Sequence, residues 1–164
     1  MKNATTHRHE FVFEAYDSEG NLKWVEKVKN LVTNEGLNEI VDKFYKGSSY
    51  TADHYVGLID GSPTVDATDT LASHSGWSEV TDYDESGRQS LVLGSVSSQS
   101  ADNSASKAVF SINGSVTVGG GILTTVASGT SGILIGAVAF DAGDRSLQAN
   151  DTLNVTITVS AASA

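Results

Sequence analysis

The sequence of 164 residues contains no cysteine and only one proline. The absence of cysteine excludes a disulfide framework and any metal site built from thiolates. The first twenty residues lack the apolar stretch of a signal peptide, and no apolar run approaches the length of a membrane span. We therefore expect a protein that is synthesised in the cytoplasm, needs no oxidising compartment and enters no membrane.

Positive charge is also scarce. Ten lysine and arginine residues stand against twenty acidic residues, which gives a formal net charge of −10. Such a surface repels the phosphates of nucleic acids and the headgroups of anionic lipids. All lysines except Lys107 precede residue 47. The balance predicts a protein that binds no nucleic acid and whose partner surface is neutral or basic.

The remaining composition favours β-strands. After residue 86 the chain consists largely of Ser, Thr, Gly, Val, Ala and Ile. Alternation is clearest in "TLNVTITVS", where one face carries Leu153, Val155, Ile157 and Val159. In "EFVFEAY" one face carries Phe11, Phe13 and Ala15. Further strands are expected at "EFVFEAY", "LKWVEKV", "HYVGLI", "SLVLGSV", "KAVFSI", "SVTV" and "GILTTVA". We predict a flexible N-terminus at residues 1–8 and one β-rich domain at residues 9–164, an antiparallel β-sandwich of jelly-roll or Ig-like type.

One helix is predicted at about residues 33–46. Thr33 is a good N-cap, and Gly47 is a natural stop. Leu37, Ile40, Val41 and Phe44 follow the spacing of a single apolar face. We therefore expect this face to be buried against the strands.

The segment "GILIGAVAF" is apolar on both of its faces. It is expected to be either a central strand covered on both sides or a strand with one face against another subunit. Large aromatic residues are frequent anchors of such contacts. The interface candidates are Trp24, Trp77, Ile133, Ile135 and Phe140.

Residues 60–86 form a long acidic stretch with few apolar residues. Its carboxylates could form a calcium site. However, Asp60, Asp66 and Asp69 do not follow the ligand spacing of a calcium-binding loop. An adventitious calcium ion stays an open alternative to aspartates that form turns. We predict a long, ordered surface loop that Trp77 fixes to the body or to a neighbouring molecule.

Signatures of catalysis are lacking. No Ser-containing elbow of a hydrolase and no phosphate-binding loop occur in their required context. His7 and His9 share one side of a strand, but the sequence suggests no third metal ligand. We predict no catalytic residue, no cofactor site and no metal site.

Several motifs carry a resemblance to a known family. They are "YVGLI", "ASHSGWSEV", the pattern Y-x-E-S-x-R from Tyr83 to Arg88, and "DTLNVTITVS". With the sequence around them, over roughly residues 20 to 160, the chain resembles small virion proteins of tailed bacteriophages. The resemblance implies a virion context and the role of a capsid decoration (cement) protein, and it implies no active site.

We therefore expect a non-enzymatic structural protein on the outside of an icosahedral phage head. Its expected partners are the major capsid protein and further copies of itself, because symmetric oligomers close their interfaces. A tail, fibre or connector component of the same virion is the first alternative. A carbohydrate-binding β-sandwich module, with aromatic side chains as a sugar platform, is the second.

Overall fold

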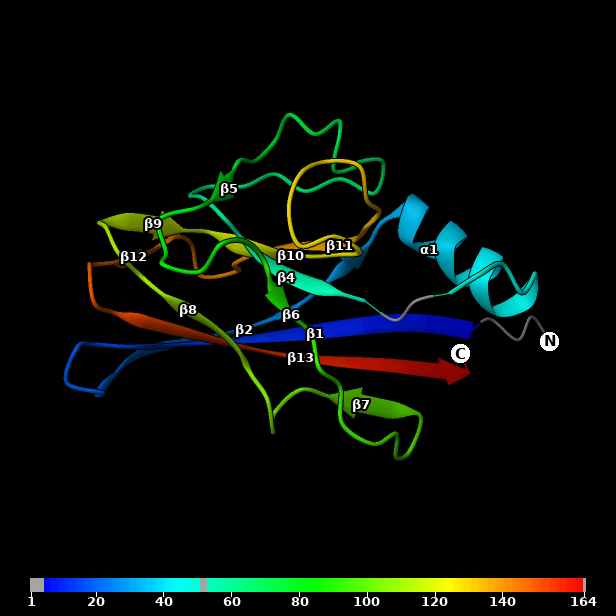
Figure 1. Ribbon diagram of the computed structural model, residues 1–164, viewed down its shortest axis with the longest axis horizontal. Coiled ribbons are helices and arrows are strands. Elements are labelled where there is room, and N and C mark those ends of the chain that lie inside the picture. Colours follow the sequence, from blue (N-terminus) through cyan, green and yellow to red (C-terminus); the bar gives the residue numbers. More distant parts are fainter. Residues whose placement is uncertain (1–4, 51–52, 164) are drawn as a thin grey trace.

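The computed structural model describes residues 5–50 and 53–163, and it shows a mainly β chain with antiparallel sheets and one short helical segment (Figure 1). The strands are β1 (Thr5–Tyr16), β2 (Leu22–Lys29), β3 (Leu31–Val32), β4 (Tyr55–Ile59), β5 (Glu79–Val80), β6 (Gln89–Ser90), β7 (Ser100–Asp102), β8 (Ala108–Ser111), β9 (Val116–Val118), β10 (Gly120–Thr124), β11 (Leu134–Ala139), β12 (Arg145–Leu147) and β13 (Thr152–Ser163). The helical segment consists of α1 (Asn34–Ile40) and the π-helical η1 (Val41–Tyr45).

The first sheet is built on the pairing of the two longest strands. β1 and β13 pair without a break from Thr5↔Ser163 to Tyr16↔Thr152. The sheet order is β2-β1-β13-β7, and β8 also pairs with β13. β1 begins at Thr5, which is earlier than the expected domain start at residue 9, because β13 supplies partners along its whole length. Residues 1–4 of the expected flexible N-terminus lie outside the described residues.

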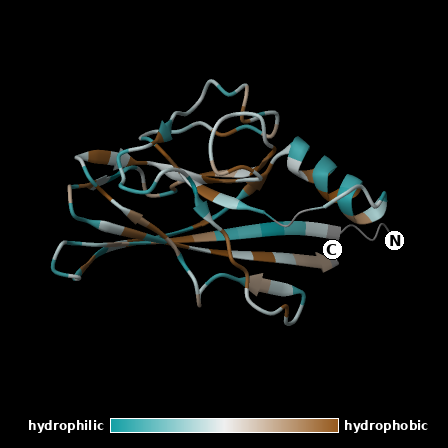
Figure 2. Ribbon diagram, in the orientation of Figure 1, coloured by the Kyte–Doolittle hydropathy of each residue, from teal (hydrophilic) through white to brown (hydrophobic). Residues whose placement is uncertain are grey.

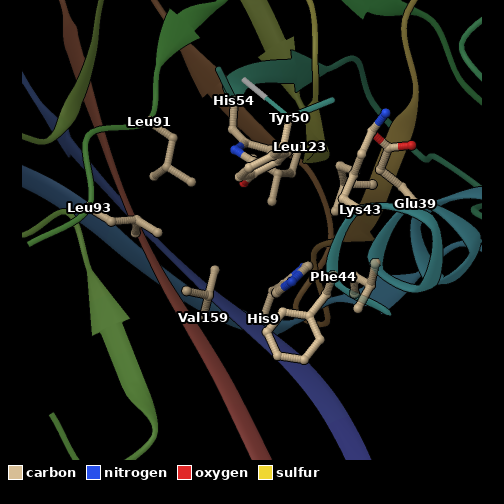
Figure 3. Close-up of a pocket in the computed structure, with 12 residues that line it drawn as sticks. His9, Glu39, Lys43, Phe44, Tyr50, His54, Leu91, Leu93, Leu123 and Val159 are labelled. Atoms are coloured by element: carbon tan, nitrogen blue, oxygen red, sulfur yellow. The ribbon is translucent and has the colours of Figure 1, made fainter. Parts of the chain in front are cut away.

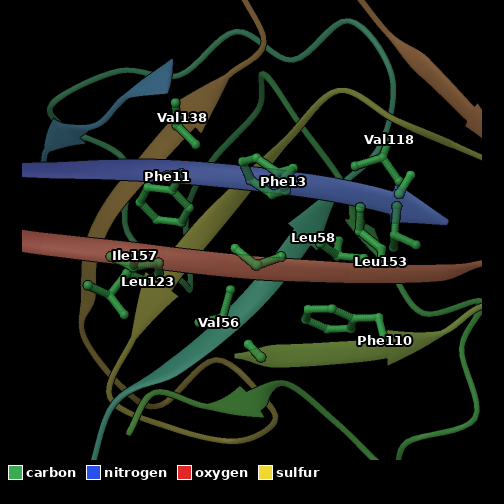
Figure 4. Packing of buried hydrophobic residues seen from close by; sticks show 14 of the residues in the cluster. Phe11, Phe13, Val56, Leu58, Phe110, Val118, Leu123, Val138, Leu153 and Ile157 are labelled. Atoms are coloured by element: carbon green, nitrogen blue, oxygen red, sulfur yellow. The ribbon is translucent and has the colours of Figure 1, made fainter. Parts of the chain in front are cut away.

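The second sheet has the order β3-β11-β10-β4-β5, with β6 also paired to β4. β9 and β12 form a separate two-stranded ribbon. The strands of the first sheet cross those of the second, and both sheets point apolar side chains into the space between them (Figure 4). Fully buried members of this shared core are Phe11, Phe13, Val56, Leu58, Phe110, Leu153, Val155 and Ile157.

The alternation expected in the two long strands is confirmed. Phe11, Phe13 and Ala15 of β1 are fully buried, as are three alternate residues of β13 that begin at Leu153. Hydrophobic and less hydrophobic residues alternate along β13 in Figure 2. A strand between a core and solvent requires this period of two, which is why both could be predicted.

The expected strand "SLVLGSV" is largely wrong. Only Ser90 belongs to a strand, and Leu91–Val96 runs as an irregular segment. It has single backbone hydrogen bonds, from Leu91 N–H to the His54 carbonyl and from Gly94 N–H to the Asp102 carbonyl. Because no strand pairs along it, the side chains of Val92 and Val96 stay exposed.

The helix begins as predicted, but its predicted buried face is wrong. The Thr33 hydroxyl accepts a hydrogen bond from the Gly36 N–H at 3.1 Å. Leu37 and Val41, in contrast, are exposed, and Phe44 is 78% exposed. The segment meets the second sheet near its N-terminal end, where Glu35 accepts a hydrogen bond from the Leu134 N–H, and it projects beyond the sheets (Figure 1).

The doubly apolar segment is a central strand covered on both sides. β11 lies between β3 and β10. Its pairing with β10 shifts at Thr124, so Ile135 is an extra residue in the ladder. The shift puts Ile135 and Val138 in the core between the sheets, while Leu134 and Ala137 belong to a second cluster.

That second cluster lies beneath the loop of residues 60–86. Leu71 and Trp77 of the loop pack with Ile59, Ile122, Leu134 and Ala137 on the outer face of the second sheet. The Trp77 Nε1–H donates to Asp69 at 3.0 Å, and the indole stacks on the His74 ring with centroids 3.5 Å apart. The acidic loop is therefore ordered and covers the sheet, so both faces of the second sheet are buried.

Candidate functional site: an apolar groove between the helix and the first sheet

A cavity lies where β1 and β13 run past the second sheet. It has a volume of about 370 Å³. Figure 3 shows Leu91 and Leu93 on one side and Lys43 and Phe44 of the helical segment on the other. The lining is mostly apolar and consists of His9, Glu39, Ile40, Lys43, Phe44, Tyr50, His54, Leu91, Leu93, Leu123, Ile135 and Val159.

A second hollow of about 260 Å³ adjoins the first. The two share His9, Leu93 and Val159. Its other lining residues come from the ends of the long strands and from residues 96–101: His7, Val96, Gln99, Ser100, Ala101, Ser160 and Ala161. We refer to the two hollows together as the apolar groove.

The groove is present because two segments do not fold as the sequence predicted. The helical segment holds Phe44 at the groove wall, instead of burying it against the strands. On the opposite side, the irregular segment Leu91–Val96 contributes the buried Leu91 and the exposed Leu93 and Val96. The surroundings add the exposed aromatic side chains of Tyr45 and Tyr50. Apolar surface of this kind, gathered beside a cavity, is typical of contact with a ligand or a partner.

His9 contributes an uncharged imidazole to the groove. The side chain is 8% exposed, and its Nδ1 lies 2.8 Å from the Asn30 side-chain nitrogen. Burial lowers the pKa of His9 to about 4, with smaller contributions from the nearby His54 and His7. At neutral pH the groove therefore presents apolar carbon and a neutral ring at this position.

Two cationic side chains without an ion-pair partner lie on the first sheet near the groove. Seven of the described lysine and arginine side chains form ion pairs: Lys23, Lys27, Lys43, Lys46, Arg88, Lys107 and Arg145. Arg8 and Lys29 are exposed and have no ion-pair partner among the described residues. They are available to a carboxylate from outside the chain.

The five interface residues predicted from the sequence are engaged within the chain. Ile135 and Phe140 are 6% and 7% exposed, and Trp77 is 7% exposed. Trp24 and Ile133 pack, partly buried, against the core between the sheets. The Phe140 ring contacts both Phe13 and Trp24 edge to face. Of these five, only Ile135 also lines the groove, and a contact of the others with a partner stays a prediction.

The pattern from Tyr83 to Arg88 has structural contacts. Tyr83 is buried and meets Phe110 edge to face, and the Glu85 carboxylate accepts from the Ser111 N–H and hydroxyl. Arg88 donates to Glu79 through two nitrogens at 2.7 and 2.8 Å, and to two carbonyl oxygens of residues 126–129. These residues therefore hold neighbouring segments together.

The structure brings no metal-binding set together among residues 5–50 and 53–163, where no three His, Asp or Glu side chains converge as ligands. His7 and His9 both line the groove, on β1. In the same described part of the chain, no helix has the length and apolar character to cross a membrane.

Sequence reasoning missed the groove because it expected Phe44 to be buried against the strands and Leu93 to lie within a strand. A signal in the sequence was the apolar and aromatic side chains of residues 37–50 and 91–96, among them Phe44, Tyr50 and Leu93. In comparisons with known proteins, no family model matches the chain. No curated protein matches it significantly either.

Proposed function

We propose that the protein is a non-enzymatic structural protein of a phage virion, a decoration protein that binds the outside of an icosahedral head and stabilises it. The observation that carries the proposal is the apolar groove with its exposed neighbours Phe44, Tyr45 and Tyr50. This surface suits protein contact, while a net charge of −10 disfavours the DNA-filled interior of a head. The resemblance of the sequence to small phage virion proteins supports the same role.

The proposed partners are the major capsid protein and further copies of the chain. Contacts repeated over a shell turn modest affinities into a large stabilisation. We extend the proposal to the fold: the two antiparallel sheets with a shared core fit a β-sandwich of jelly-roll or Ig-like type.

A binding experiment with virus particles tests the role. Purified protein is added to heads that lack it, and bound copies are counted by cryo-electron microscopy before the heads are heated. The proposal expects saturable binding over the whole shell and a higher rupture temperature. Binding at a single vertex or on the tail would assign the protein to the tail or connector class instead. No binding to any particle would contradict both.

The carbohydrate alternative receives no support from the adjacent exposed rings of Phe44 and Tyr45. A sugar platform requires rings that lie in one plane. The rings of Phe44 and Tyr45 are instead 86° apart. A glycan-array measurement with no signal is the expected result.

A further inference from the structure

We propose that the apolar groove docks an extended segment of a partner protein in which apolar residues alternate with acidic ones. The proposal concerns the chemistry of the partner and is independent of the virion role, because its test uses synthetic peptides and no particle. Shape, backbone and charge each support it.

The shape of the groove fits an extended chain. Its two hollows, of about 370 and 260 Å³, are joined at His9, Leu93 and Val159. Residues two apart in an extended strand point to the same side and lie about 7 Å from each other. His9 lines the first hollow and His7, two residues away on β1, lines the second, so apolar side chains two apart in a strand that runs beside β1 lie next to both hollows.

On the side of β2, the N-terminal end of β1 has no strand partner among the described residues. β2 pairs with β1 only as far as Lys29, opposite Glu10, and the Asn30 N–H then donates to the His9 carbonyl. Because backbone groups alternate in direction along a strand, those of His7 point to the same side as those of His9. On that side the described residues give His7 no backbone partner. A partner strand can continue the ladder there, as in recognition by strand addition.

Charge selects the partner. Lys29 follows the buried Val28 and lies opposite Glu10 in the register. Arg8 precedes the buried His9 on β1. Alternation therefore places Arg8 and Lys29 on the face of the sheet that points away from the groove. An added strand thus meets the groove with one set of side chains and these two unpaired cations with the other.

A second copy fits this edge poorly. Two copies that paired their β1 edges about a two-fold axis would bring Arg8 and Lys29 close to the same cations of the partner copy. Like charges opposite each other destabilise a strand pair. The groove is therefore assigned to a different chain that supplies carboxylates.

The test is a binding titration with labelled synthetic peptides of about seven residues, the number that extends over roughly 23 Å. The probe alternates glutamate with leucine and phenylalanine. One control peptide has the same composition with its glutamates grouped together, and a second has lysine in place of glutamate. Fluorescence anisotropy is expected to show binding of the alternating acidic peptide about tenfold tighter than either control, weakened by added salt. Amide exchange at His7 is expected to slow on binding.

Matched variants test separately the contribution of the two cations and that of the apolar groove to peptide binding. Arg8→Ser combined with Lys29→Ser removes two positive charges and is expected to weaken the peptide about tenfold. Ser18→Glu combined with Ala105→Glu lowers the net charge by the same amount at exposed turns and is expected to have a much smaller effect. Phe44→Ser should also weaken binding, while Leu22→Ser, at another exposed apolar position, should not.

Three results would overturn the proposal. They are no binding up to about 1 mM peptide, equal binding of the grouped and alternating peptides, and an unchanged affinity in the variant that lacks Arg8 and Lys29. Tight binding of a fatty acid such as decanoate with no peptide binding would assign the groove to lipid and would also overturn it. Failure of the peptides leaves the particle experiment unaffected, so the two proposals fail separately.

Discussion

Gly36 of α1 and Ile135 of β11 approach so closely that a Cβ built on Gly36 would lie 2.3 Å from the Ile135 carbonyl oxygen. The obstacle is backbone, which cannot rotate away as a side chain can. The hydrogen bond from the Gly36 N–H to the Thr33 hydroxyl fixes the same turn. The helical segment can therefore rest on β11 only because residue 36 lacks a side chain, and this contact sets where Phe44 stands beside the groove.

Gly36→Ala is expected to lower the free energy of unfolding by about 1–3 kcal/mol. Alanine is the better helix former by about 1 kcal/mol, so a loss of stability would reveal the contact with Ile135. Asn38→Ala is the control, because Asn38 is exposed on the same helix, and it should leave stability unchanged or slightly higher. Urea unfolding followed by circular dichroism measures both. A Gly36→Ala protein at least as stable as the wild type would contradict the close contact.

Trp77→Ala is expected to lower the free energy of unfolding by about 3–5 kcal/mol. The reason is its burial with Leu71 and Leu134 beneath the loop of residues 60–86. Tyr45→Ala removes an aromatic side chain that is 72% exposed, and it should change stability by less than about 0.5 kcal/mol. Chemical denaturation compares the two variants. Unchanged stability in Trp77→Ala would show that the loop is not held by this residue.

Arg88→Met is expected to destabilise the protein by about 3–5 kcal/mol, because the carboxylate of Glu79 loses its buried partner. The variant also frees the carbonyls of Val126 and Gly129, so amide exchange should speed up in residues 126–132. Lys107→Met removes the more exposed pair with Glu14, for which about 0–1 kcal/mol is expected. Similar losses in both variants would count against a special role of the buried pair.

Stability is expected to fall as the pH is lowered from about 6.5 to about 4. The pKa of His9 is lowered to about 4 in the folded chain, so in this range the unfolded chain binds the proton and the folded chain does not. The stabilisation is therefore complete above pH 6.5 and is lost as the pH falls to the folded pKa. The maximum contribution is about 3 kcal/mol.

His9→Gln provides the comparison, since it keeps a polar group near Asn30 and does not titrate. Free energies of unfolding measured at several pH values should fall less steeply in this variant than in the wild type. Identical slopes would contradict a His9 that is neutral because of burial.

The sequence determined the features that depend on local periodicity and capping. Phe11, Phe13, Leu153 and Ile157 are buried as their alternation predicted, because a strand against a core has no other way to separate apolar from polar side chains. Thr33 caps the helix as expected, since its hydroxyl reaches an N–H only three residues away. Both results need information from a few neighbouring residues alone.

Only the tertiary structure decided which apolar side chains are covered. Phe44 has the helical spacing of a buried residue and is exposed, because the approach of Gly36 to Ile135 fixes how the helical segment lies. Leu93 is exposed because no strand pairs along its segment. Burial depends on what lies opposite a residue in space. The start of the helical segment and β11, which meet at Thr33 and Leu134, are about one hundred residues apart in the chain. The spacing of apolar residues does not show which distant segments come into contact, so the groove could be recognised only in the folded chain.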